Sequence, residues 1–191
     1  MILPVSLLPI PLEDIGVKDD QFMHPSDLHG AAHVNRVIFH AMQITVLQGL
    51  TAYLPEIWAA AYLHDLSRRH DGICHLHGQW SVEEQMPRYV DFFLQGRINP
   101  ERQSLIEDAV RTHCQDIELP RNPVAVVLKD ADALDRVRLG DLDAGRLRLK
   151  HTPTLIPKAE ELMELTNNSA DWLTIWHMGN AIYKSSNRLT W

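Results

Sequence analysis

The chain has 191 residues, of which 45% are hydrophobic, and its formal net charge at pH 7 is −7. This length and apolar content fit one domain with a full core. The acidic balance argues against a general nucleic-acid binder, which would normally present a basic face, although a local group of arginines could still bind the phosphate of a small ligand.

The N-terminus is apolar but interrupted by Pro4, Pro9 and Pro11, and it lacks the basic start and the small-residue cleavage site of a signal peptide. No apolar run approaches the roughly 18 residues that a membrane span requires. Cys74 and Cys114 are too few for a disulfide framework, so we expect reduced thiols. Together these features predict a cytoplasmic protein without a membrane partner.

Proline spacing and apolar periodicity predict how the chain is organised. Residues 1–23 are expected to form an extended arm, which either straps the core or contributes to a homodimer contact. Residues 24–191 are expected to form a single all-α domain. Its expected helices cover 28–50, 56–66, 80–94, 101–116, 124–134, 154–166 and 170–184. Two glycines place a loop at 69–78, and β-branched residues leave a strand conceivable over 124–134.

Polar side chains interrupt the apolar helices at His33, at the pair His64 and Asp65, at His113 and at Asp132. A buried polar group costs free energy unless it is paired, so a single one of these would fit a satisfied core residue or a helix cap. Taken together, they would each need a separate partner. One divalent ion bound by imidazole and carboxylate groups would satisfy them jointly.

A lone His, then a His-Asp pair, then a distant Asp, each on a different helix, resemble the HD superfamily of metal-dependent phosphohydrolases. The segments similar to its motifs are residues 29–37, 63–68 and 129–136. The resemblance covers about residues 28–140. It implies a compact helical domain of the HD type, with a metal site between the central helices.

The resemblance also implies the ligands of that site. A divalent ion (Mn²⁺, Mg²⁺, Co²⁺, Fe²⁺, Ni²⁺ or Zn²⁺) is expected to be held by His33, His64, Asp65 and Asp132. Some family members have further histidines between the second and last motifs and bind two ions. His77 and His113 are similar to these additional ligands, whereas His70 and His75 fit solvated loop side chains. Whether the site binds one ion or two therefore stays open.

The implied reaction is hydrolysis of a phosphate ester or anhydride of a nucleotide or a similar small molecule. Water activated by the metal would be the nucleophile, with Asp65 or His64 assisting proton transfer. Two alternatives stay open. One is a di-iron oxygenase of the same fold, which His77 and His113 permit. The other is a non-catalytic module that binds a nucleotide or a metal.

Basic residues near the motifs are candidates for binding the substrate. The chain has Arg68 where some nucleotidases of the superfamily have a glutamate, and Arg68 and Arg69 suit bidentate binding of a phosphate. Arg36, Lys129 and Arg136 could contact the substrate or form salt bridges within the protein. Asp135 is closer than Asp130 to the helical face of Asp132, so Asp135 could orient a ligand.

Overall fold

A computed structural model of the protein describes residues 3–167 and 169–185, and these ranges contain helices and no strand. The α-helices are α1 (Ala31–Leu47), α2 (Leu54–Leu63), α3 (His77–Trp80), α4 (Met86–Gln95), α5 (Gln103–Thr112), α6 (Pro123–Leu134), α7 (Ile156–Thr166) and α8 (Trp172–Ser185). A π-helical turn, Ser81–Gln85, joins α3 to α4. The all-α prediction is confirmed, and the segment 124–134 is a helix rather than a strand.

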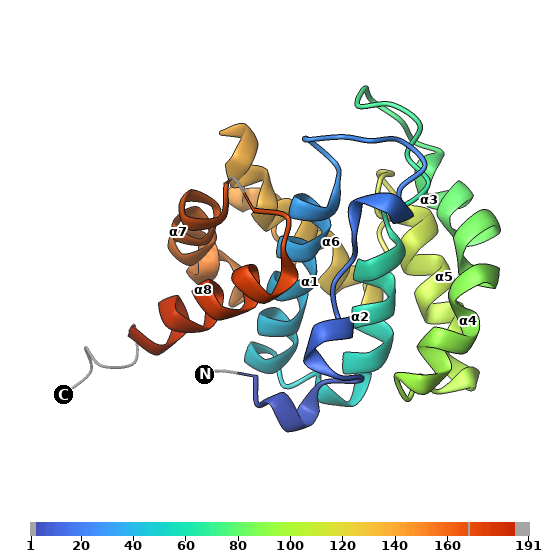
Figure 1. The fold of residues 1–191 in the computed structure, drawn as a ribbon, viewed down its shortest axis with the longest axis horizontal. Coiled ribbons are helices and arrows are strands. Elements are labelled where there is room, and N and C mark those ends of the chain that lie inside the picture. The colour runs from blue at the N-terminus through green and yellow to red at the C-terminus, as the bar shows by residue number, and fades with distance from the viewer. Residues whose placement is uncertain (1–2, 168, 186–191) are drawn as a thin grey trace.

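Helix α1 lies at the centre of the molecule (Figure 1) and packs against α2, α6 and α8. Helix α5 packs against α2 and α6, and α4 lies at the outer edge on the same side. The pair α7 and α8 covers the opposite side. The two helices expected to be central, α2 and α6, therefore lie inside the bundle, where they can carry buried site residues.

Local chemistry fixes where the central helices begin. Pro55 is in the first turn of α2, where its missing N–H is not needed. The side chain of Asn122 accepts hydrogen bonds from the N–H groups of Val124 and Ala125 and so caps α6. This cap explains why the β-branched residues that follow Asn122 are helical.

The N-terminal arm packs on the core but is not uniformly extended. It contains three short 3-10 helices, Val5–Leu7, Leu12–Asp14 and Asp19–Gln21. Its apolar side chains Leu3, Leu8, Ile15 and Val17 are buried. Asn35 of α1 bonds to both the N–H and the C=O of Val17, and the Trp58 indole donates to the Ile15 carbonyl. Of the two interpretations of the arm, the strap is the one that these contacts describe.

The segment after α2 departs from expectation in one respect. We expected a loop over 69–78 and a helix from residue 80, but the helix begins at His77. The Ser81 hydroxyl lies 3.2 Å from the His64 carbonyl, to which it donates, and it accepts from the Ser67 N–H at 3.3 Å. These bonds tie the end of α3 to the end of α2 and bring His77 towards His64.

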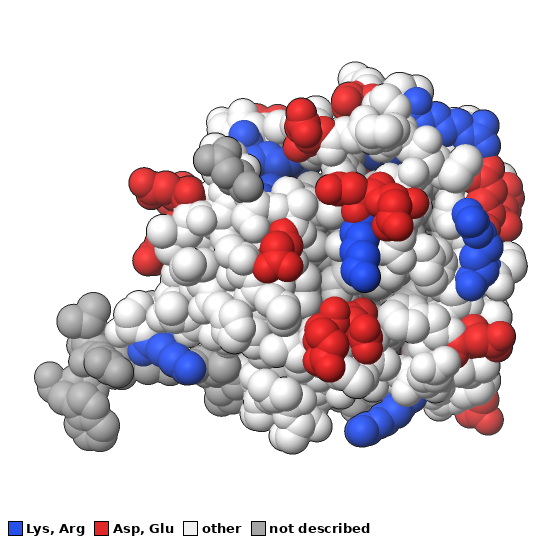
Figure 2. Space-filling model, in the orientation of Figure 1, with Lys and Arg blue, Asp and Glu red and all other residues white. Residues whose placement is uncertain are grey.

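On the face seen in Figure 2, Lys and Arg side chains are interspersed with Asp and Glu side chains. Among the residues that the structure describes, none of the helices combines the length and the apolar character needed to cross a membrane.

His40 of α1 is a polar residue inside the core. Its side chain is buried, and neither ring nitrogen has a hydrogen-bond partner within the described part of the chain. Burial lowers the pKa of His40 from 6.5 to about 4. The unfolded chain, in which His40 titrates normally, therefore binds a proton that the folded chain excludes between these two values.

We expect the free energy of unfolding to fall as the pH decreases from 6.5 towards 4, with His40 contributing up to roughly 3 kcal/mol of that loss. His40→Met removes the titrating group at similar volume, so it should reduce the loss without lowering stability at neutral pH. Urea unfolding of both proteins, at neutral pH and at a mildly acidic pH, measures this difference. If the free energy of unfolding fell equally in the two proteins on acidification, His40 would not contribute to the loss.

Candidate metal centre

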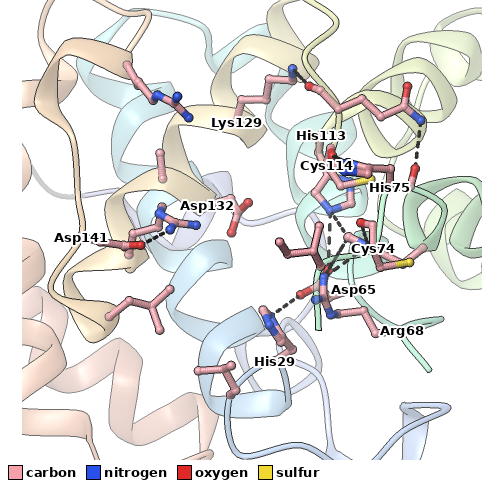
Figure 3. Close-up of a pocket in the computed structure, with 18 of the residues that line it drawn as sticks. His29, Asp65, Arg68, Cys74, His75, His113, Cys114, Lys129, Asp132 and Asp141 are labelled. Atoms are coloured by element: carbon pink, nitrogen blue, oxygen red, sulfur yellow. Dashed lines mark hydrogen bonds and ion pairs between the residues drawn. The ribbon is translucent and has the colours of Figure 1, made fainter. Parts of the chain in front are cut away.

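The six residues predicted as metal ligands converge at one end of the helical bundle. They come from the start of α1 (His33), the turn after α2 (His64 and Asp65), the start of α3 (His77), the residue after α5 (His113) and the last turn of α6 (Asp132). Figure 3 shows Asp65 between His29 and His113, with Asp132 across the pocket. Residues separated by up to about half the chain thus share one small volume.

Asp65 is at the centre of this group, and its two oxygens face different histidines. Oδ2 lies 3.6 Å from Nε2 of His33 and 3.9 Å from Nε2 of His64. Oδ1 lies 3.0 Å from Nε2 of His77 and 3.6 Å from Nε2 of His113. The Asp65 side chain is only 4% exposed, so the histidines rather than solvent surround it. One carboxylate is therefore shared between two sets of ligands.

We call the first set site A, which consists of His33, His64, Asp132 and Oδ2 of Asp65. Nε2 of His33 lies 3.4 Å from Nε2 of His64 and 3.4 Å from Oδ1 of Asp132. Both imidazoles are buried, whereas the Asp132 side chain is one-third exposed to the pocket. His33, His64 and Asp132 could hold a metal ion, and so could His29, His33 and Asp65.

The second set, site B, consists of His77, His113 and Oδ1 of Asp65. Nε2 of His77 lies 2.8 Å from Nε2 of His113, and both side chains are buried. Gly78 allows this approach, because a Cβ atom there would lie 2.2 Å from the Val110 carbonyl and 3.1 Å from Nδ1 of His113. His77 and His113, together with Cys114, could also hold a metal ion.

Hydrogen bonds orient all four imidazoles in the same way. In each ring Nδ1 lies beside an acceptor: His33 at 2.7 Å from Asp135, His64 at 2.8 Å from the Ala61 carbonyl, His77 at 2.9 Å from the Cys74 carbonyl and His113 at 2.7 Å from the Val110 carbonyl. A neutral ring that donates from Nδ1 carries a lone pair on Nε2. With Nδ1 as the donor in each ring, the Nε2 atoms in both sites face each other and a carboxylate, so a proton or a cation is required between them. In site B, Nη1 of Arg68 also lies 3.2 Å from Nδ1 of His77.

The pKa values of Asp65, His64 and His33 reflect their burial and the contacts that these groups make with one another. Burial raises the pKa of Asp65, but the His64 ring and the other imidazoles outweigh it and hold that pKa well below its ordinary value. Burial lowers the pKa of His64 to about 4. Burial also lowers the pKa of His33, but hydrogen bonds to Asp132 and Asp135 raise it above its ordinary value. Site A therefore attracts positive charge, which a divalent cation would supply.

Arg36, which the sequence analysis considered for substrate binding, lies beneath site A rather than in the pocket. Its Nε donates to Oδ1 of Asp135 at 2.6 Å, and both side chains are buried. Asp135 in turn accepts from Nδ1 of His33. Burial raises the pKa of Asp135, but His33 and Arg36 together lower it to about 2. Arg36 therefore braces the carboxylate that orients His33.

The neighbouring residues Arg68 and Arg69 point in different directions. Arg68 lines the pocket, with Nη1 3.9 Å from Oδ1 of Asp65 and Nη2 donating to the Gly72 carbonyl at 3.0 Å. Arg69 does not reach the pocket, because it bonds to Glu84 at 2.6 Å and stacks over the Trp80 ring. Of this pair, only Arg68 is positioned to contact a ligand.

Lys129 lines the pocket, but its Nζ is already engaged. It donates to the carbonyls of Gln115 at 2.9 Å and Ile117 at 2.6 Å, and it lies 3.5 Å from Glu118. Burial lowers the pKa of Lys129. This lysine joins α6 to the segment after α5, and a substrate contact would have to replace one of these bonds.

The pocket over the metal centre has a volume of about 800 Å³. Four arginines from the segment after α6 contribute to its wall: Arg136, Arg138, Arg146 and Arg148. The sequence analysis considered Arg136 but did not assign the other three to the site, although two Arg-X-Arg patterns, at 136–138 and 146–148, were a readable signal. His29 was also not assigned, yet its Nδ1 lies 3.3 Å from Oδ2 of Asp65. The pocket thus combines imidazoles with guanidinium groups.

Comparison of the chain with protein-family models, with curated proteins and with solved structures found no match.

Proposed function

We propose that the protein is a metal-dependent phosphohydrolase of the HD superfamily type that binds two divalent ions, one in site A and one in site B. The observation that carries this proposal is the pairing of Nε2 lone pairs in both sites around the two oxygens of Asp65. A divalent ion in each site would replace these short contacts with coordination bonds. The mixed nitrogen and oxygen donors suit Mn²⁺, Fe²⁺, Co²⁺, Ni²⁺ or Zn²⁺.

The chemistry that such ions supply is a lowered pKa of coordinated water and stabilisation of charge on a phosphoryl oxygen. Asp65 would fix the spacing of the two sites, and the buried ring of His64, whose pKa is about 4, would stay neutral as a ligand at neutral pH. His29 lines the pocket beside Asp65 and fits a role in moving a proton.

The proposed substrate is a small phosphorylated molecule such as a nucleotide. Arg68 lies at the edge of site B, and Arg136 and Arg146 line the pocket farther along the chain. Guanidinium groups bind phosphate oxygens through paired N–H donors. Cys74 and Cys114 are both free thiols, which fits the proposed cytoplasmic location.

The test is phosphate release from a panel of nucleotides and phosphoesters. The protein is purified, analysed for metal, stripped with a chelator and reloaded with Mn²⁺, Co²⁺ or Mg²⁺. We expect activity with at least one ion and none in the stripped protein. Arg68→Ala should raise KM by about 10-fold or more, because a charge-assisted hydrogen bond contributes roughly 1.5–3 kcal/mol. Arg69→Ala, which removes an arginine outside the pocket, is the matched control and should leave KM unchanged.

Three outcomes would count against phosphohydrolysis. Inactivity across the panel with every ion would remove the proposal. Two bound irons with an O₂-dependent spectral change would favour the di-iron oxygenase instead. Tight nucleotide binding without turnover in any metal would favour the non-catalytic module.

A further inference from the structure

Cys114 lies next to site B. It follows His113 directly after α5, is partly buried, and lines the same pocket. Its Sγ and the ligand nitrogens of His77 and His113 all lie within 4.8 Å of one another. These three residues could therefore hold one ion, and Oδ1 of Asp65 lies beside them, 3.0 Å from Nε2 of His77.

The backbone around Cys114 is fixed by contacts on both sides. The Gly78 N–H is hydrogen-bonded to the Cys114 thiol, and His75 Nδ1 lies 3.0 Å from the Cys114 carbonyl. The Gln115 side chain donates to the His75 carbonyl at 3.1 Å. Burial raises the pKa of the Cys114 thiol, and the Gly78 N–H opposes this shift only in part. The positions of His77 and Cys114 are thus set by packing between α3 and the end of α5.

We propose that Cys114 is a thiolate ligand of site B, completing a set of two imidazoles, one carboxylate oxygen and one sulfur. This inference rests on the proposed metal centre, but it concerns the identity of a ligand rather than the reaction. Among the described residues, site A has no sulfur donor. The two sites would therefore differ in chemistry, with two nitrogens and two oxygens in one and a sulfur in the other.

A sulfur ligand changes which ions the site prefers. Thiolates favour Zn²⁺, Co²⁺ and Fe²⁺ over Mg²⁺, which binds oxygen ligands. We therefore expect site B to take up Co²⁺ or Zn²⁺ in preference to Mg²⁺. Site A, with its two carboxylate oxygens, should accept the harder ions more readily.

Cobalt provides the test, because a thiolate bound to Co²⁺ gives a charge-transfer absorption band in the near ultraviolet. The metal-free full-length protein is titrated with Co²⁺ while absorbance and bound metal are followed. We expect the band in the wild type and in Cys74→Ser, and its loss in Cys114→Ser. Cys74→Ser is a matched control, since Cys74 is also a free, partly buried thiol that lines the pocket.

A second measurement needs no variant. In the wild type, alkylation followed by peptide mapping should show Cys114 protected by Co²⁺ and Cys74 less affected. Two bound Co²⁺ ions without a charge-transfer band would overturn the thiolate assignment and leave the two-ion centre standing. A band that persists in Cys114→Ser and disappears in Cys74→Ser would also overturn it. Failure to bind Co²⁺ at all would remove the metal centre itself.

Discussion

Asp65→Ala is expected to prevent metal binding at both proposed sites and to reduce the proposed phosphohydrolase activity on the order of 10³-fold or more. The carboxylate is the one residue whose two oxygens face both sites, with Oδ2 3.6 Å from His33 and Oδ1 3.0 Å from His77. Without the ions the transition state would lose several kcal/mol of stabilisation. A free-energy difference of that size corresponds to a decrease in rate on the order of 10³-fold. The measurements are metal content after dialysis and kcat/KM on the best substrate of the panel.

Two other variants test whether the effect of Asp65→Ala comes from lost metal binding or only from the loss of one negative charge. Asp91→Asn makes a comparable change in net charge on the exposed surface of α4 and should retain both ions and activity. His77→Ala should lose the ion of site B and keep that of site A. If Asp65→Ala lost only one ion, Asp65 would not be shared between the sites, and the arrangement of two coupled ions would be wrong.

The sequence carried enough information to identify the ligands one by one. His33, His64 and Asp132 stood out because each is polar within an apolar helix, and that contrast depends on sequence alone. The division of Asp65 between two sites could not be predicted, because it depends on which way each carboxylate oxygen points after the helices have packed. His77 required the unexpected early start of α3 to reach Asp65.

The arginines show where prediction from sequence reaches its limit. Arg68 and Arg69 are adjacent and chemically identical, but they lie in the irregular segment after α2, where the local backbone decides which way each side chain points. One faces Asp65 and the other bonds to Glu84. Arg36 lies one turn from His33, as expected, but its partner comes from a segment 99 positions away in the chain. Only the tertiary structure distinguishes a ligand-facing arginine from a bracing one.

The same reasoning separates the two aspartates that flank Asp132. Asp130 and Asp135 are both fully buried, yet they have different partners. Asp130 accepts from the backbone N–H groups of Arg148 and Leu149, at 2.8 and 2.9 Å, and so holds the segment after α6. Asp135 accepts from His33 at 2.7 Å and from Arg36. Asp135 is therefore a positioning residue for site A, and Asp130 is a structural residue.

Asp135→Asn is accordingly expected to weaken metal binding at site A by roughly 10- to 100-fold while leaving site B little changed, because residues that orient a ligating histidine contribute about this much. Asp135→Ala should in addition destabilise the fold by about 3–5 kcal/mol, since it leaves the Arg36 charge buried and unpaired. Metal titration resolves the two affinities, and urea unfolding measures the stability.

Asp130→Asn is the matched control, since it neutralises an equally buried carboxylate in α6, the helix that ends just before Asp135. It should lower stability without changing the ratio of the two metal affinities. That ratio is the decisive quantity, because a general loosening of the fold would weaken both sites together. An unchanged ratio in Asp135→Asn would mean that the contact with Asp135 does not orient His33 for an ion, and that the buried pair of Asp135 and Arg36 serves the stability of the bundle alone.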